Sequence, residues 1–192
     1  MFTRLGIVTG RRTVADVLAE AQRLGTLGDR PIDEVIEHAR LFLAGLDGVT
    51  GTVVDIGTGA GVPGLVLAEA RPDLTFLLVD RRGARTDALR RGVTACGLAD
   101  RVTVVEGDTA VVGRDARWAG QCAAVVSRGF GPPSDTLEAA RAFLSAGGRL
   151  VVSEPPDRDP GRWPEPLLEA LGFSKPLYFK GIAMFHVEQS GE

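Results

Sequence analysis

The residues most able to do chemistry lie in one glycine-rich stretch, Asp55–Gly64, which reads Asp-Ile-Gly-Thr-Gly-Ala-Gly-Val-Pro-Gly. It follows a strand-like run and precedes a helix-like one. Glycine lets backbone amides approach a ligand closely, and such turns lie at the carboxyl ends of strands, where open α/β sheets bind ligands. The dinucleotide fingerprint that it also matches is weak by itself. We predict ligand contacts from Asp55, Gly57, Thr58, Gly59, Gly61 and Pro63.

Acidic residues at strand ends narrow the choice of ligand. Asp55 would repel a pyrophosphate, and Asp80 ends the second predicted strand, where its carboxylate can accept hydrogen bonds from both hydroxyls of a ribose. A third loop, Glu106–Thr109, faces the same crevice. Together they predict a nucleoside pocket that needs no phosphate, which suits S-adenosylmethionine, an adenosine carrying a sulfonium and an amino acid. The contacts predicted from these strand ends are Asp80, Arg81, Gly107, Asp108 and Thr109.

Short apolar runs alternate with helical ones from Gly51 onward, which predicts a doubly wound α/β sheet. Continuous β-branched runs suit strands buried on both faces. The last two strand-like stretches are separated only by Gly181, which permits a hairpin and no parallel crossover, so the final strand should run antiparallel. The predicted strands are 52–56, 75–79, 102–105, 123–126, 149–152, 175–180 and 182–188, and the predicted helices between them are 64–70, 84–96, 134–144 and 163–171.

The N-terminal part of the chain has a different pattern. Residues 13–24 and 31–46 carry apolar side chains at helical spacing, which predicts a small helical cap too short to fold alone. We therefore divide the chain into a helical cap, residues 1–48, and a ligand-binding domain, residues 49–192.

Composition bounds the class of protein. The chain has 192 residues, 44% hydrophobic and 24% charged, with a net charge of −3, which is average for a globular protein and less basic than most proteins that grip nucleic acid. Cys96 and Cys122 stand in apolar surroundings, and His38 and His186 are interpreted as structural. No leader or membrane-length apolar run is seen, so we expect a cytoplasmic monomer that binds neither membrane nor metal.

Several motifs together resemble the class I methyltransferases, and more narrowly the ribosomal RNA small subunit methyltransferase G family (the glucose-inhibited division B proteins). The resemblance covers about residues 35–150 and is carried by Asp55–Gly64, Arg71-Pro72-Asp73, Leu78-Val79-Asp80, Val105-Glu106-Gly107 and Val125-Val126-Ser127-Arg128-Gly129-Phe130. It implies a seven-stranded sheet, S-adenosylmethionine as methyl donor, and N7 of a guanine in small-subunit ribosomal RNA as acceptor.

The chain also departs from the family pattern. Gly129 replaces an alanine of the usual Ser-Arg-Ala-Phe, the N-terminal Asn-Leu-Thr is absent, and Ala44-Gly45-Leu46 stands where Asp-Ser-Leu is expected. At the end of the fifth strand Ser153-Glu154 replaces a Lys-Gly pair, which reverses the charge expected near the acceptor. The resemblance thus supports the cofactor half of the site better than the RNA half.

The acceptor side is predicted from fewer residues. Arg128, at the mouth of the crevice, is the candidate catalytic residue and a further cofactor contact; its alternative is a surface arginine paired with Asp135. A basic run, Arg81–Arg85, could track a phosphate backbone or form an ordinary solvated helix face. Guanine N7 has a free lone pair, so its methylation needs no general base. The alternatives are a methyltransferase acting on a small molecule, a non-catalytic S-adenosylmethionine-binding relative, and a nicotinamide-dependent oxidoreductase, which Asp55 disfavours.

Overall fold

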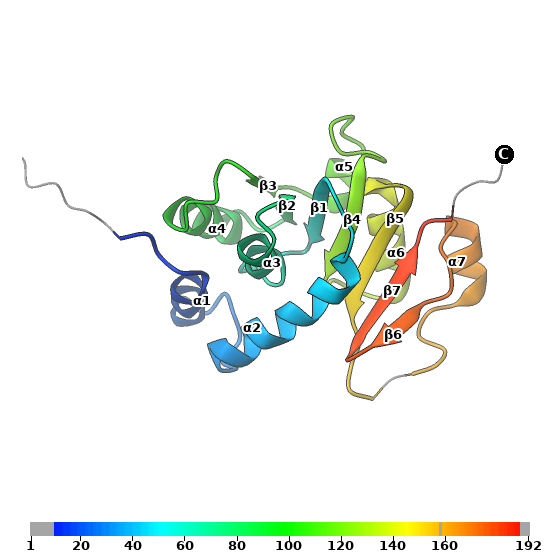
Figure 1. The fold of residues 1–192 in the computed structure, drawn as a ribbon, viewed down its shortest axis with the longest axis horizontal. Helices are drawn as coiled ribbons and strands as arrows, with labels where there is room; N and C mark the ends of the chain where they lie inside the picture. The colour runs from blue at the N-terminus through cyan, green and yellow to red at the C-terminus, as the bar shows by residue number, and fades with distance from the viewer. Residues whose placement is uncertain (1–9, 158, 189–192) are drawn as a thin grey trace, which may run out of the picture.

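The computed structural model describes residues 10–157 and 159–188, and its centre is a seven-stranded sheet covered by helices on both faces (Figure 1). The strand order is β3-β2-β1-β4-β5-β7-β6. This confirms the predicted α/β, doubly wound, mostly parallel sheet. The strands are β1 (Thr52–Ile56), β2 (Thr75–Asp80), β3 (Val102–Glu106), β4 (Cys122–Ser127), β5 (Leu144–Ser153), β6 (Leu177–Phe179) and β7 (Ile182–His186).

The strand order reverses beside β1. After β1 the chain builds β2 and β3 outward on one side, then returns to place β4 and β5 on the other, all in parallel. The carboxyl ends of β1 and β4 therefore meet at a topological switch point, where sheets of this kind bind ligands. β7 lies antiparallel to both β5 and β6, so the antiparallel final strand is also confirmed.

Two layers of helices bury the two faces of the sheet. One face packs against the first four α-helices and holds a core that includes Leu18, Phe42 and Leu78; the other packs against the last three and holds a core that includes Phe143 and Phe185. All five of these side chains are buried. The helices are α1 (Val14–Arg23), α2 (Ile32–Arg40), the 3-10 helix η1 (Leu41–Leu46), α3 (Gly64–Ala70), α4 (Gly83–Ala95), α5 (Thr109–Val112), α6 (Pro133–Phe143) and α7 (Glu165–Leu171).

The N-terminal helices are fastened to the sheet by close packing and by two arginines, Arg71 and Arg149. Arg149 of β5 donates to the Asp47 carbonyl at 2.6 Å. An added Cβ on Gly45 of η1 would lie 2.7 Å from Cγ2 of Val151 on β5, so the backbones approach closely there. The Arg71 guanidinium, which follows α3, donates to the carbonyls of Leu46 (2.7 Å) and Val49 (2.9 Å) and pairs with Asp73.

The boundary near residue 48 between a cap and a ligand-binding domain stays a prediction, and the outer ends of both segments, residues 1–9 and 189–192, lie outside the described residues.

Several predicted boundaries were wrong for local reasons. The helix expected over 31–46 divides into α2 and η1, since the tighter 3-10 turn is a common way to end a helix. The chain passes directly from Phe143 into β5, because Leu144 is extended and pairs with Cys122 of β4. The register is then irregular until Arg149 pairs with Ala124. Trp163 lies outside α7 because it comes directly before Pro164, and the residue before a proline disfavours helical backbone.

None of the helices among residues 10–157 and 159–188 has the length and apolar character needed to cross a membrane.

Candidate functional site

The glycine turn between β1 and α3 is held by its own backbone. Gly57, Gly59 and Gly61 all have positive φ, at 67°, 56° and 97°, a conformation that favours glycine. The Thr58 amide donates to the Val79 carbonyl of β2 at 3.0 Å, and the Gly61 amide donates to the Thr58 carbonyl at 2.9 Å. Two amides of the turn are thus already bonded within the protein and do not face outward as a phosphate cradle would require.

Asp55 anchors this turn from inside the sheet. Its side chain is fully buried, and Oδ2 accepts hydrogen bonds from the Thr58 hydroxyl at 2.7 Å and the Gly64 amide at 2.8 Å. The other oxygen, Oδ1, has no hydrogen-bond partner among the described residues. Burial raises the pKa of Asp55 to about 7, although the two hydrogen bonds and the charge of Arg128 oppose that shift.

Asp80 joins the ends of β1 and β2. One carboxylate oxygen accepts from the Gly59 amide at 2.9 Å and the other from the Arg82 amide at 2.9 Å. The side chain is 7% exposed and lies in the wall of a hollow. Because a carboxylate oxygen can accept a second hydrogen bond, Asp80 can hold the turn and still receive a ligand hydroxyl.

The hollow at these strand ends has a volume of about 710 Å³, within the range of small-molecule sites. Six predicted contacts line it: Gly57, Asp80, Arg81, Gly107, Asp108 and Thr109. Six do not: Asp55, Thr58, Gly59, Gly61, Pro63 and Arg128. Of these six, all but Arg128 belong to the glycine turn or, in the case of Asp55, hold it in place. They therefore support the wall of the hollow without facing it.

Phe130 also lines the hollow, although the sequence motif that contains it did not predict a contact there. An added Cβ on Gly57 would lie 2.8 Å from Cδ2 of its ring, so the ring rests directly on the glycine turn. Gly129 and Pro132 continue the same wall. Further residues missed as contacts are Arg82, Arg85 and Arg114, which also line the hollow; the only signal for the first two was the basic run Arg81–Arg85.

The end of the third strand also lines the hollow. The Gly107 amide donates to the Asp80 carbonyl at 3.0 Å, which fixes the β3 loop to β2. Asp108 then caps the one-turn helix α5, where its carboxylate accepts from the Ala110 amide at 2.8 Å. This helix was not predicted, because a single turn leaves no periodic pattern in the sequence.

Arg128 is not among the residues that line the hollow, although its neighbours Gly129 and Phe130 are. It is half-buried and forms no ion pair among the described residues, so the alternative of a pair with Asp135 is not seen. Burial lowers the pKa of Arg128, whereas the negative charge of Asp55 raises it. His38 of α2 faces this group: its Nδ1 is buried without a partner in the described part of the chain, and burial followed by the charge of Arg128 lowers the pKa of His38.

Glu154 does not present a free negative charge, contrary to the expectation from its place at the end of β5. Its side chain is 8% exposed, and Oε1 accepts from the indole nitrogen of Trp163 at 2.9 Å and lies 3.5 Å from Nε of Arg162. The charge is thus paired with Arg162 through Oε1, whereas Oε2 is buried without a hydrogen-bond partner among the described residues.

Among residues 10–157 and 159–188, no cysteine lines the hollow. Cys122 is fully buried, and burial raises the pKa of its thiol to about 11, whereas the thiolate is the reactive form. No group of three or more His, Cys, Asp or Glu side chains is placed to bind a metal ion in that part of the chain.

The fold and the position of the hollow define the class of protein. The structure aligns with a SAM-dependent O-methyltransferase from Thermotoga maritima with a TM-score of 0.69 and 16% sequence identity, covering 94% of this chain and 73% of that one. This likeness shows the fold, which is that of the class I methyltransferases.

Sequence comparison then assigns the family. Residues 17–154 match the model of the rRNA small subunit methyltransferase G family, so the chain belongs to that family. The ribosomal RNA small subunit methyltransferase G of Kineococcus radiotolerans is 34% identical over 144 residues, covering 73% of this chain and 55% of the relative. That of Halorhodospira halophila is 33% identical over 160 residues, covering 80% and 69%. The chain thus spans about half of the first relative's length.

Proposed function

We propose that this protein is an S-adenosylmethionine-dependent methyltransferase that methylates N7 of a guanine in small-subunit ribosomal RNA. The observation that carries the cofactor assignment is the Asp80 carboxylate in the wall of the hollow, bonded to the Gly59 amide of the turn. An acidic wall beside internally bonded amides suits a ribose and does not suit a pyrophosphate. The nicotinamide alternative therefore loses its phosphate site.

The residues around the hollow fit the parts of this cofactor. Asp80 would receive the ribose hydroxyls, and Gly107 and Asp108 would border the adenine. The unpartnered Oδ1 of buried Asp55 is a place where a nearby cationic group would be stabilised, since an opposite charge favours the ionised carboxylate. When bound, S-adenosylmethionine supplies an electrophilic methyl group on a sulfonium.

The protein's own contribution is positioning. The lone pair of guanine N7 carries no proton, so no side chain has to act as a base, in agreement with the absence of a histidine from the hollow's lining. Holding donor and acceptor in line can supply up to roughly 7–11 kcal/mol of the barrier in favourable systems. We assign Arg128 to the acceptor side, together with His38, which has a buried unpartnered nitrogen and whose pKa the charge of Arg128 lowers.

The RNA assignment is supported by the family and by the names of the relatives. The charge reversal at Glu154, which favoured a small-molecule acceptor, loses its weight because that carboxylate is paired with Arg162. A ribosomal substrate would place the reaction in the cytoplasm.

The decisive experiment is methyl transfer from labelled S-adenosylmethionine to small ribosomal subunits that lack this modification. We expect label in the RNA at a guanine N7, with none transferred when acceptor is omitted or replaced by a short unrelated RNA. Label in a small molecule alone would favour a diverged acceptor, and cofactor binding without transfer to any acceptor would indicate a non-catalytic relative.

A further inference from the structure

A row of unpaired arginines leads away from the hollow along α4. Arg81 and Arg82 precede this helix, and Arg85 and Arg91 lie on it; we call these four residues the arginine track. None of their side chains forms an ion pair or hydrogen bond within residues 10–157 and 159–188. Arg90 of the same helix, by contrast, pairs with Asp87 at 2.7 Å.

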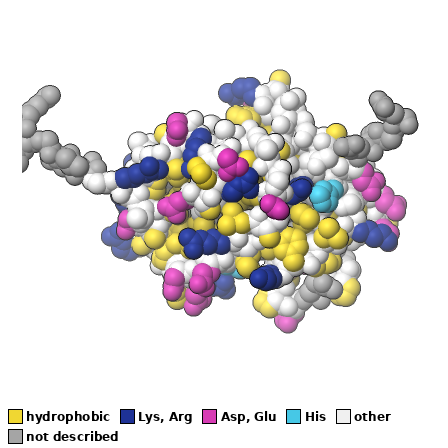
Figure 2. Space-filling view, in the orientation of Figure 1, with side chains coloured by type: hydrophobic (Ala, Val, Ile, Leu, Met, Phe, Trp, Pro, Cys, Tyr) yellow, Lys and Arg dark blue, Asp and Glu magenta, His cyan; other side chains and the backbone are white. Residues whose placement is uncertain are grey.

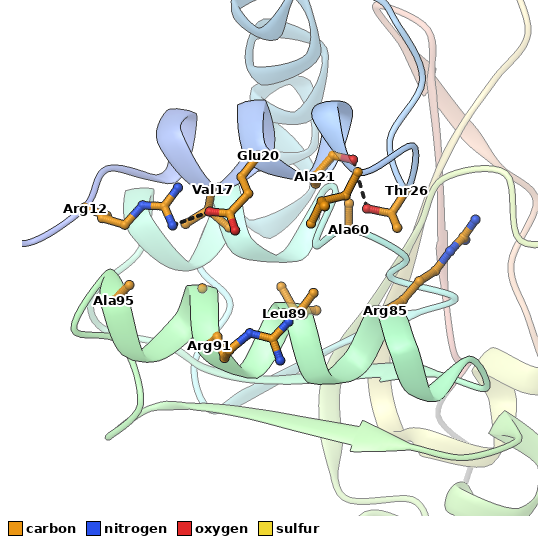
Figure 3. Close-up of a pocket in the computed structure, with 13 residues that line it drawn as sticks. Arg12, Val17, Glu20, Ala21, Thr26, Ala60, Arg85, Leu89, Arg91 and Ala95 are labelled. Carbon is orange, nitrogen blue, oxygen red and sulfur yellow. Dashed lines mark hydrogen bonds and ion pairs between the residues drawn. The ribbon is translucent and has the colours of Figure 1, made fainter.

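The arginine track connects two depressions of the surface. Arg81, Arg82 and Arg85 line the hollow at the strand ends, and Arg85 and Arg91 line a second cavity of about 210 Å³ between α1 and α4 (Figure 3). Arg85 belongs to both, and its guanidinium lies beside Gly59 of the glycine turn. Along α4, Arg85 and Arg91 are six residues apart, which corresponds to about 9 Å of rise.

The far end of the second cavity is closed by internal pairing. Arg12 is bonded to Glu20 there, and the floor between α1 and α4 is apolar, with Val17 and Leu89 among its residues. Most basic side chains visible in Figure 2 lie over the half of the molecule that carries α1 to α4. The first hollow is also lined by Asp80 and Asp108 at the strand ends, by Asp135 and Glu138 of α6, and by Arg114 after α5. Three of its four arginines, Arg81, Arg82 and Arg85, lie at or just before the start of α4.

The proposed cofactor does not explain all of these charges. S-adenosylmethionine carries no phosphate, is cationic at sulfur and has a single carboxylate, which one arginine such as the predicted contact Arg81 can neutralise. The other unpaired arginines suit a further, anionic ligand. We propose that the arginine track binds consecutive backbone phosphates of the RNA strand next to the target guanine and guides that strand from the α1–α4 groove to the mouth of the hollow. This inference rests on the proposed function, because it assumes an RNA acceptor.

Only part of the basic run Arg81–Arg85, which could have formed a single solvated helix face, lies on α4. Arg81 and Arg82 lie before the first turn of α4, so they extend the row past the helix end toward β2 instead of sharing a face with Arg85. The arginine track is therefore longer than one face of α4, which suits the binding of several phosphates along an extended RNA strand.

The test is the salt dependence of RNA binding by the intact chain, measured by fluorescence anisotropy with a labelled fragment of small-subunit ribosomal RNA that contains the target guanine. The variants are Arg82→Ala, Arg91→Ala and the double variant, with Arg117→Ala as matched control. Arg117 is 73% exposed and pairs with Asp115 in the loop after α5, so its removal changes the net charge equally. S-adenosylmethionine affinity is measured in parallel by calorimetry.

Each lost phosphate contact should reduce the slope of log K against log salt by about 0.7–0.9, and weaken binding about five- to eightfold at 0.1 M salt. We expect this for each single variant, twice the slope change for the double variant, and wild-type binding for Arg117→Ala. Cofactor affinity should be retained in Arg91→Ala, which lies outside the first hollow.

The inference is overturned if the track variants bind RNA as the wild type does, if Arg117→Ala weakens binding equally, or if the intact chain shows no salt-dependent RNA binding. The proposed function fails differently: RNA would bind through the arginine track without methyl transfer to guanine, or transfer would go to a small molecule.

Discussion

The Asp55 carboxylate shows how one buried residue can link the stability of the protein to pH. It accepts two hydrogen bonds through one oxygen and leaves the other without a partner among the described residues, at a position with no exposure to solvent. Desolvation of the charged form is the largest influence on its pKa. The folded protein therefore holds the proton on this group to a higher pH than the unfolded chain does.

This difference predicts a pH dependence with a definite sign. The folded pKa of Asp55 is about 7 against an ordinary 3.8, so its stabilising contribution is complete below about pH 4 and is lost as pH rises through 7. In Asp55→Asn the amide oxygen can keep both hydrogen bonds. We expect the variant's free energy of unfolding, relative to wild type, to increase by roughly 2–4 kcal/mol between pH 4 and pH 8. Urea denaturation at several pH values measures it, and a constant difference would contradict the assignment.

Asp80→Ala tests the ribose contact. The change removes the acceptor of the Gly59 and Arg82 amides together with the proposed acceptor of the ribose hydroxyls. Hydrogen bonds to a charged group contribute about 1.5–3 kcal/mol each, so S-adenosylmethionine affinity should fall at least about tenfold by calorimetry.

The matched control is Asp135→Ala, which removes the same charge from the opposite wall of the hollow. An equal loss of affinity in this control would mean that overall charge, and no specific contact by Asp80, holds the cofactor.

Sequence reasoning located the site but not the task of each side chain. The strand-end aspartates and the glycine turn follow from spacing and topology alone. That Asp80 holds the Gly59 amide, that Phe130 rests on Gly57, and that Glu154 bonds Trp163 all depend on contacts between residues that are separated in the sequence and brought together by the fold. No local pattern encodes such contacts.

The glycine turn is the element on which the hollow depends, and its requirement for glycine has two separable causes. At Gly57 a side chain would meet both a positive φ of 67° and the Phe130 ring at 2.8 Å, whereas at Gly129 the φ is 68° and nothing lies within 4 Å. Comparing substitutions at Gly57 and Gly129 therefore separates the cost of the Phe130 contact from the cost of the positive φ.

We expect Gly129→Ala to destabilise the protein by about 1 kcal/mol, because of the left-handed backbone alone. Gly57→Ala should cost about 1–3 kcal/mol more, because overpacking adds to that strain, and should also weaken cofactor binding. Thermal unfolding with and without S-adenosylmethionine measures both. Equal costs for the two variants would show that the Phe130 contact adjusts freely.

At the level of elements, the strongly apolar strands and long amphipathic helices could be predicted, and their ends could not. β5 starts at Leu144 within a segment that contains Gly147 and Gly148, residues that weaken any strand signal. Pairing with β4, which supplies the missing order, is a property of the assembled sheet.

For the whole molecule, the question is whether the N-terminal helices and the sheet unfold together. Leu18 of α1 is fully buried in the core that also contains Leu78 of β2, whereas Leu24 is 60% exposed. Trp118 and Trp163 both lie beyond residue 48, so their fluorescence reports on the predicted ligand-binding domain alone.

If one core joins both parts, Leu18→Ala should lower the stability reported by tryptophan fluorescence by about 2–5 kcal/mol, and Leu24→Ala should change it by less than about 0.5 kcal/mol. Chemical denaturation followed by fluorescence and by circular dichroism measures both. Separate transitions by the two methods, with the fluorescence transition unmoved in Leu18→Ala, would show that residues 1–48 unfold independently.

The Arg71 guanidinium has a consequence for substitutions that preserve charge. Its planar fork satisfies two carbonyls on the approach to β1 and a carboxylate two residues ahead. A lysine ammonium is a point donor on a flexible stem and cannot reproduce that fork. Charge alone would rank Arg71→Lys as harmless. Because lysine cannot make all three contacts, we expect the substitution to loosen the connection between η1 and the sheet.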